Sequence, residues 1–158
     1  MSNKHEFKTI VVPYDGSDQA KHAFSMACDL IGDDPDAKLM LLHVVPSGMV
    51  GTMDNAEGNT IDGVPWGLLD YETYKDVVSA ALDRVKKEVL DSLGDSVHDE
   101  RITVEAVADT SPAEAIAKYA ATHGADLIVM GRRGLGALRG SVSYGVLHSA
   151  EMPVLTVK

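Results

Sequence analysis

The sequence lacks the features that mark several classes of protein. Its 158 residues include one cysteine, Cys28, so no disulfide forms within the chain. No apolar run approaches the ~18 residues of a membrane-spanning helix, and the opening MSNKHEFKTI has no apolar core of a secretory signal. A net charge of −10 opposes non-specific binding to nucleic acid or to an anionic membrane. We therefore expect a cytoplasmic protein that binds neither nucleic acid nor membranes.

Several catalytic and ligand-binding motifs are also missing. The Walker pattern GxxxxGK[ST] is absent, and the first expected strand is followed by Tyr14-Asp15-Gly16-Ser17 rather than by GxGxxG. Neither HExxH nor GxSxG occurs, and the six histidines are dispersed. These absences argue against P-loop phosphotransfer, Rossmann-type dinucleotide binding, a dedicated transition-metal site and a serine-hydrolase elbow. Cys28 lies among apolar helix positions, which is typical of a core residue.

Five apolar segments alternate with four helical patterns along the chain. The expected strands are 7–14, 38–45, 102–108, 127–130 and 154–157, and the helices begin near residues 18, 71, 112 and 142. Strict alternation of nearly continuous apolar strands with helices predicts a doubly wound α/β fold with a five-stranded parallel sheet. The length suits one domain, 1–158. Residues 47–69 contain five glycines and are expected to form a long loop.

Polar residues mark the start of two of these helices. Ser17 or Asp18 is suited to cap the first helix, which Gly32 ends. Ser111, Pro112 and Glu114 form the pattern of a capping box at the third.

The stretch from Asp126 to Ala150 combines a strand, a glycine-rich turn and a helix start. Glycine lets the backbone approach an anion closely, and the free N–H groups of a helix's first turn point toward it. Arg132, Arg133 and Arg139 lie in this turn of an otherwise acidic chain. In doubly wound sheets ligands bind at the carboxyl ends of strands where the strand order reverses, which brings this turn beside Asp15. The alternative is a turn that needs glycine only for its geometry.

Taken together, the segments VVPYDGS, LLHVV, SPAEAI, IVMGRRG, GSVS and PVLTVK resemble the universal stress proteins over essentially the whole chain. The resemblance implies an adenine nucleotide alpha-hydrolase-like fold and a homodimer. One branch of that family binds ATP through a G-x2-G-x9-G-[ST] motif. The terminal strand Val154–Val157 would lie at a sheet edge, where pairing with a second copy would cover it.

The resemblance also implies a set of nucleotide-binding residues. Asp15 would lie by the ribose or by a Mg²⁺-phosphate group, and the Val44 backbone would meet the adenine edge. The remaining residues would surround the ligand and its phosphates: Pro13, Met130, Gly131, Gly134, Gly140, Ser141 and Val142. The implied ligand is ATP, or ADP or AMP, with Mg²⁺.

The chain departs from the ATP-binding motif at one place. Five residues separate Gly134 from Gly140, where the motif has nine. Two alternatives therefore stand beside an ATP-binding regulatory protein: a non-ATP-binding family member acting as an interaction dimer, and a nucleotide hydrolase of the same fold. Neither Ser17 nor Ser141 has an evident His/Asp partner, so binding is favoured over catalysis. His43 is interpreted as a hydrogen-bonded structural residue, and Trp66 either covers the ligand, contacts a partner or anchors its loop.

Overall fold

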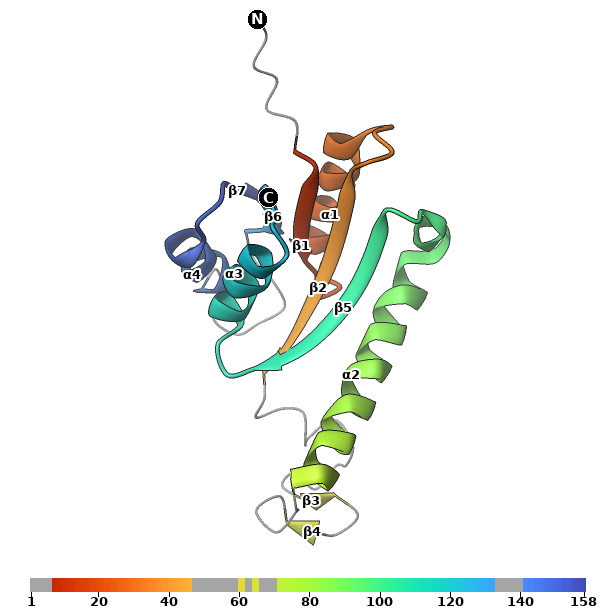
Figure 1. Cartoon of the computed structure of the whole chain (residues 1–158), viewed down its shortest axis with the longest axis vertical. Coiled ribbons are helices and arrows are strands. Elements are labelled where there is room, and N and C mark those ends of the chain that lie inside the picture. Colours follow the sequence, from red (N-terminus) through yellow and green to blue (C-terminus); the bar gives the residue numbers. More distant parts are fainter. Residues whose placement is uncertain (1–6, 47–59, 62–63, 66–70, 133–140) are drawn as a thin grey trace, which may run out of the picture.

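A computed structural model describes residues 7–46, 60–61, 64–65, 71–132 and 141–158. Its central sheet has five parallel strands in the order β5-β2-β1-β6-β7 (Figure 1). The strands are β1 (Thr9–Pro13), β2 (Lys38–Pro46), β5 (Ile102–Asp109), β6 (Leu127–Gly131) and β7 (Val154–Val157). The five-stranded doubly wound fold expected from the sequence is confirmed.

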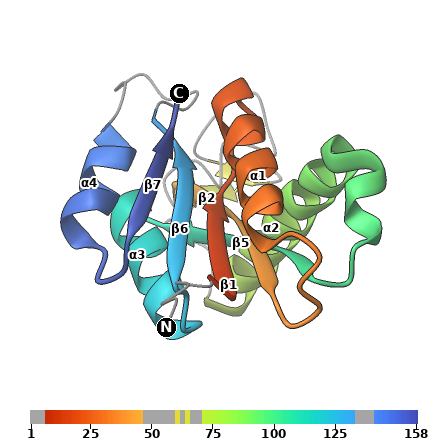
Figure 2. The same ribbon diagram turned by 90° about the horizontal axis from the view of Figure 1, so that it is seen from above.

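Four helices connect these strands and cover both faces of the sheet. They are α1 (Asp18–Ile31), α2 (Tyr71–Leu93), α3 (Pro112–Thr122) and α4 (Ser141–Ser149), and a 3-10 helix, Gly94–His98, follows α2. Figure 2 shows α3 and α4 on one side of β6 and α1 on the other. Helix α2 shares the α1 face, because Val89 of α2 lies in the same core cluster as Ala23 and Ala27 of α1.

The two-residue period of the strands divides the core into two parts. Ile10 and Val12 of β1 face α1, whereas Val11 between them packs with Ile116 of α3 and Val146 of α4. All three β1 side chains are fully buried. A strand buried on both faces requires an unbroken apolar run rather than an alternating one, which is what the sequence of β1 has.

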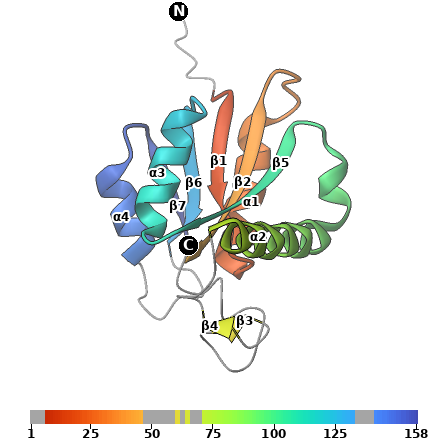
Figure 3. The ribbon, with the colours of Figure 1, turned by 60° about the horizontal axis from the view of Figure 1, so that its bottom comes forward.

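The segment 47–69, expected from its composition to be a loop, contains two short strands. Thr60–Ile61 (β3) and Val64–Pro65 (β4) pair antiparallel as a short hairpin, which Figure 3 shows apart from the central sheet. The remainder of that segment, including Trp66, lies outside the described residues.

The predicted start of α1 is confirmed and that of α3 is partly wrong. The Ala20 N–H donates to Ser17 Oγ at 3.1 Å, and Gly32 ends α1 with a positive φ of 48°. Ser111 does occupy the N-cap of α3, but its side chain makes no capping hydrogen bond. Its N–H, which a capping box would pair with Glu114, instead donates to Asp109 Oδ1 at 3.0 Å. The nearer carboxylate therefore takes the donor.

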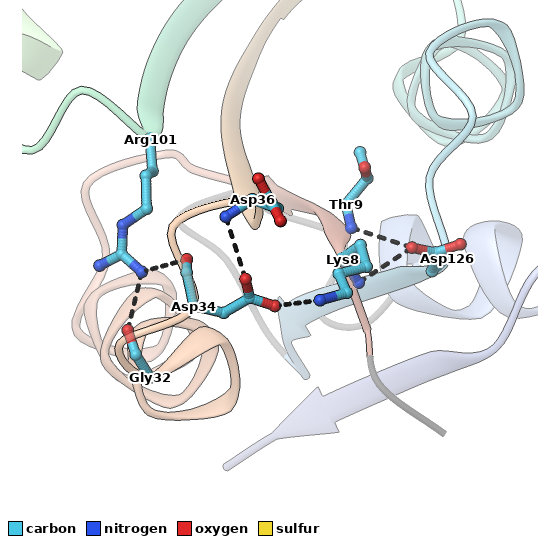
Figure 4. Close-up of polar contacts among 7 residues, drawn as sticks. All are labelled: Lys8, Thr9, Gly32, Asp34, Asp36, Arg101 and Asp126. Carbon is cyan, nitrogen blue, oxygen red and sulfur yellow. Dashed lines mark hydrogen bonds and ion pairs between the residues drawn. The ribbon is translucent and has the colours of Figure 1, made fainter. Parts of the chain in front are cut away.

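Polar side chains join the amino-terminal ends of the strands (Figure 4). Asp126 Oδ2 accepts hydrogen bonds from the N–H groups of Lys8, at 3.0 Å, and Thr9, at 2.9 Å. The Lys8 ammonium pairs with Asp34. Arg101 Nη1 donates to the carbonyl oxygens of Gly32, at 2.8 Å, and Asp34, at 3.0 Å. Loops that are distant in sequence are thus held together at the edge opposite to the expected ligand site.

Arg101 also binds Asp99 through two side-chain hydrogen bonds. Arg101 Nε donates to Asp99 Oδ1 at 3.0 Å, and Nη2 donates to Oδ2 at 2.8 Å. The Arg101 backbone N–H donates to Oδ1 as well, at 3.0 Å. The guanidinium and this N–H stabilise the ionised carboxylate and lower the pKa of Asp99 to about 2.

This pairing predicts an acid-dependent contribution to stability. The pKa of Asp99 is lower in the folded chain than its unfolded value of about 3.9, so the stabilisation is complete above pH ~4 and is lost as the pH falls toward about 2. We expect Asp99→Asn to lower the unfolding free energy by a constant amount from pH 7 to ~5, and by progressively less below ~4. Urea unfolding at a series of pH values measures this difference.

Asp95→Asn is the control, because Asp95 is exposed and forms no hydrogen bond or ion pair with the residues that the structure describes. Its difference from wild type should not follow that pH profile. An Asp99→Asn effect as large at pH 2.5 as at pH 7 would show that the carboxylate charge is not its source.

Cys28 is half-buried against the core cluster under α1, as its apolar helix position indicated. Burial, followed by the nearby Asp29 charge, raises the pKa of its thiol. Among the described residues, no helix has the length and apolarity needed to cross a membrane.

Candidate functional site

The strand order reverses at β1. The chain passes from β1 through α1 to β2 on one side, whereas β6 pairs with β1 on the other. The carboxyl ends of β1 and β6 are therefore neighbours, at Pro13 and Gly131 respectively, and Figure 3 shows the two strands side by side. This is the position at which doubly wound sheets bind ligands, and the turns that follow β1 and β6 begin there.

Strand β2 extends beyond the end of β1 and forms one side of the site. Pro13, the last residue of β1, pairs with Leu42, so Val44 lies two residues further along β2. Val44 pairs with Val107 of β5, which continues alongside. Its side chain packs against the core cluster under α3 and α4. The Val44 backbone is thus at the carboxyl edge, where the resemblance implied an adenine contact.

The turn after β1 is shaped by the Asp15 carboxylate. Asp15 Oδ1 accepts a hydrogen bond from the Ser17 N–H at 3.0 Å, and Gly16 between them has a φ of 79°. Ser17 then caps α1. Asp15 is half-buried. One of its oxygens therefore has a structural role in the turn, which the sequence interpretation did not distinguish from ligand binding.

His43 supports the same turn from β2. The His43 Nδ1–H donates to the Tyr14 carbonyl oxygen at 2.7 Å, because a carbonyl only accepts and the proton must lie on that nitrogen. The Tyr14 N–H donates to the Leu42 carbonyl oxygen at 2.9 Å. The interpretation of His43 as a hydrogen-bonded structural residue is confirmed, and it fixes the backbone immediately before Asp15.

Gly131 lies close to the first turn of α1. A Cβ at this position would be 2.9 Å from the Gln19 Cβ, 3.1 Å from the Gln19 carbonyl carbon and 3.3 Å from the Ala20 nitrogen. Real Cβ atoms do not approach other carbons to 2.9 Å. The glycine therefore lets α1 pack against the end of β6, a requirement that the local sequence does not reveal. Met130 before it is buried beneath α3 and α4.

The first turn of α4 forms the other side of the site. Ser141 and Val142, for which the resemblance implied phosphate contacts, are exposed at its N-terminus. Ser143 is 6% exposed, and its Oγ donates to the Arg132 carbonyl oxygen at 2.8 Å. Sequence reasoning missed Ser143. The sequence did contain one indication: a serine two positions after Ser141 lies on the opposite face of the helix, so if Ser141 is exposed, Ser143 is buried and needs a hydrogen-bond partner.

Short contacts connect these pieces around one edge of the sheet. His43 of β2 bonds to the turn that leads into Asp15, Gly131 of β6 approaches α1, and Ser143 of α4 bonds to the residue after Gly131. Two expected phosphate-site residues, Gly134 and Gly140, lie outside the described residues, as do Arg133 and Arg139. In the part of the chain that the structure describes, no three His, Cys, Asp or Glu residues form a metal-binding group.

The sequence matches the model of the universal stress protein family over residues 6–158. The chain belongs to this family. It is 37% identical to the universal stress protein MJ0531 of Methanocaldococcus jannaschii over 161 residues, covering 96% of this chain and 82% of that protein. It is 33% identical to a universal stress protein of Thermus aquaticus, covering 96% of this chain and 99% of that one.

Solved structures of universal stress proteins share the fold. UspA of Lactobacillus plantarum superimposes with a TM-score of 0.66 at 23% identity, over 97% of this chain and 99% of that one. A universal stress protein in complex with cAMP has a TM-score of 0.55 at 23% identity, over 96% and 97%. A universal stress protein from Archaeoglobus fulgidus in complex with dAMP has a TM-score of 0.52 at 19% identity, over 97% of this chain and 99% of that one. These neighbours confirm the Rossmann-like, adenine nucleotide alpha-hydrolase-like fold.

Proposed function

We propose that this universal stress protein binds an adenine nucleotide, with ATP and Mg²⁺ as the leading ligand, and acts as a regulatory module rather than as a true enzyme. The observation that carries the proposal is the placement of Asp15, Val44, Gly131 and the α4 N-terminus around the switch point of the sheet. Two fold neighbours bind cAMP and dAMP, which are both adenine nucleotides. Their chemistry supports the choice of ligand class.

The phosphates are assigned to the α4 side of the site. The first N–H groups of a helix have no partner within it, and the positive end of the helix dipole adds roughly 0.3–1 kcal/mol for an anion. Helix α4 begins with Ser141, an exposed residue at this end. The glycine-rich turn with Gly134 and Gly140 would complete the cradle. Arg132, exposed after β6, adds a positive charge to an otherwise acidic chain.

The adenine and ribose are assigned to the β1–β2 side. The Val44 backbone would meet the adenine edge, and Pro13 would line the approach at the end of β1. Asp15 suits either a ribose hydroxyl or Mg²⁺ on the phosphates, because a carboxylate oxygen is a ligand that Mg²⁺ prefers. When bound, Mg²⁺ would neutralise phosphate charge beside this acidic side chain.

The spacing between Gly134 and Gly140 is relevant to how many phosphates fit. This turn is four residues shorter than the family's ATP-binding pattern, and Gly136 within it permits a tighter path. ADP and AMP are therefore tested beside ATP. A stronger affinity for AMP than for ATP would indicate that this shortened turn limits the number of phosphates that fit.

Asp15→Asn separates ligand binding from the structure of the turn. Asparagine keeps Oδ1 as the acceptor for the Ser17 N–H but removes the charge. We expect the protein isolated from cells to carry nucleotide, seen as an absorbance ratio at 260/280 nm that falls after denaturation and filtration. Asp15→Asn and Ser141→Ala should each lower that occupancy, and added Mg²⁺ should increase nucleotide retention by wild type but not by Asp15→Asn. Equal occupancy in all three proteins would remove Asp15 and Ser141 from the site.

We further propose a homodimer that forms through β7. Val154–Val157 is the terminal strand of the sheet, and its Leu155 is 37% exposed. Helix α4, which precedes β7 in the chain, has two further exposed apolar side chains, Tyr144 at 75% and Leu147 at 54%. At the opposite edge strand, β5, the described residues include no exposed large apolar side chain. A second copy that pairs with β7 would cover both the strand edge and these side chains.

Leu155→Lys combined with Tyr144→Glu should convert the protein to a monomer, because it puts charges into the proposed interface. Sedimentation velocity should give twice the 16.8 kDa chain mass for wild type and the chain mass for the double variant. Ala121→Lys, at an exposed position of α3, is the control and should remain dimeric. A monomeric wild type at micromolar concentration would contradict the proposed dimer.

A further inference from the structure

Ser143 is a buried polar residue within the α4 helix. It is 6% exposed, and its Oγ donates to the Arg132 carbonyl oxygen at 2.8 Å. The Arg132 N–H donates to the Val157 carbonyl oxygen at 2.8 Å. The residue that follows β6 is therefore held through its N–H by β7 and through its carbonyl by α4.

This hydrogen bond spans the two halves of the proposed phosphate site. On one side are the end of β6 at Gly131 and the Arg132 backbone, and on the other are Ser141 and Val142 in the same helical turn as Ser143. Eight residues of the glycine-rich segment, 133–140, connect the two sides along the chain. The direct hydrogen bond therefore holds the Arg132 carbonyl against the first turn of α4.

Two other described contacts of α4 lie further along the helix. Val146 lies in the core under this helix, and Gly145 approaches Ala113 of α3. Both are nearer to the middle of α4 than its phosphate-facing end. In the described part of the chain, the Ser143 side chain joins the first turn of α4 to Arg132, the residue after β6.

We propose that Ser143 is a positioning residue for the phosphate site: its hydroxyl sets the distance between the end of β6 and the N–H groups at the start of α4. This rests on the proposed nucleotide function. Ser143 does not touch the ligand, in contrast to the role assigned to Ser141. Correct placement of phosphate donors has large effects on affinity, because charge-assisted hydrogen bonds weaken steeply with distance and angle.

The test compares ligands with and without phosphate. Ser143→Ala and Ser143→Cys both remove the strong hydroxyl donor at similar volume, whereas Ser143→Thr retains it. We expect the first two to weaken ATP binding by on the order of tenfold and to leave adenosine binding unchanged. Ser143→Thr should bind ATP as wild type does. Ser149→Ala, at an exposed position near the end of α4, is the matched control and should have no effect.

Amide hydrogen exchange in the ligand-free proteins provides a second measurement that does not depend on nucleotide. Loss of the hydroxyl should increase exchange in the first turn of α4 and leave α1 unchanged. An equal loss of ATP and adenosine affinity, or unchanged exchange in α4, overturns the positioning role. If wild type binds neither ligand, the proposed function fails and the positioning role fails with it, while exchange still reports whether the hydroxyl holds α4.

Discussion

Replacing Gly131 with valine is expected to lower the unfolding free energy by about 3 kcal/mol. The valine Cβ would lie 2.9 Å from the Gln19 Cβ and within 3.3 Å of two backbone atoms of α1. Backbone cannot rotate away as a side chain can, so either α1 or the end of β6 must shift. Urea unfolding followed by circular dichroism measures the loss.

Whether Gly131→Val lowers or raises the unfolding free energy distinguishes a steric contact with α1 from the strand propensity of valine. Valine is favoured over alanine and glycine in strands by up to ~1 kcal/mol, so in an open position Gly131→Val would stabilise β6. We expect the opposite order, with Gly131→Ala less destabilising than Gly131→Val. A valine variant as stable as wild type would show that α1 does not pack against Gly131. If this variant lost nucleotide binding, displacement of α1 could be the cause. Asp15→Asn and Ser141→Ala are therefore better probes of ligand contact.

Gly145→Ala is expected to lower the unfolding free energy by about 2 kcal/mol. Gly145 lies in the middle of α4, where alanine would normally be preferred by ~1 kcal/mol. A Cβ there would be 2.6 Å from the Ala113 Cβ of α3, far inside the 3.5–4.0 Å of an ordinary carbon contact. Helices α3 and α4 are therefore separated by a distance that only one methyl group can occupy.

The partner variant Ala113→Gly allows a double-mutant cycle. Alone it should cost about 1 kcal/mol through lost helix propensity. Combined with Gly145→Ala, it moves one methyl group from α3 to α4, so the double variant should be more stable than the sum of the single effects predicts, by about 1–3 kcal/mol. Additive effects would show that the two positions are not in contact.

The sequence patterns located the regular elements closely because each signal was local. The helical pattern that begins near residue 71 predicted the start of α2, and the apolar run 154–157 predicted β7, as the structure has them. The doubly wound fold expected from the alternation predicted that the turns after the first and fourth strands lie side by side, and β1 and β6 are neighbours in the sheet. These features depend on periodicity and chain connectivity, which a sequence displays directly.

The features that the sequence did not predict depend on neighbours distant in the chain or on competition between local donors. The need for glycine at position 131 arises from Gln19 and Ala20, more than a hundred residues earlier. The capping box at α3 failed because the Ser111 N–H found Asp109 rather than Glu114. Ser143 was overlooked because its acceptor is a backbone carbonyl, which no side-chain pattern records.

Calorimetric titration tests whether this universal stress protein binds an adenine nucleotide at the carboxyl ends of β1 and β6. ATP, ADP, AMP and adenosine would be titrated with Mg²⁺ into the nucleotide-free wild-type protein and into the Asp15→Asn variant. We predict saturable binding with one site per chain for at least one of the three nucleotides, weakened by Asp15→Asn. No heat above dilution for any nucleotide, from wild-type protein that is folded by circular dichroism, would contradict the account.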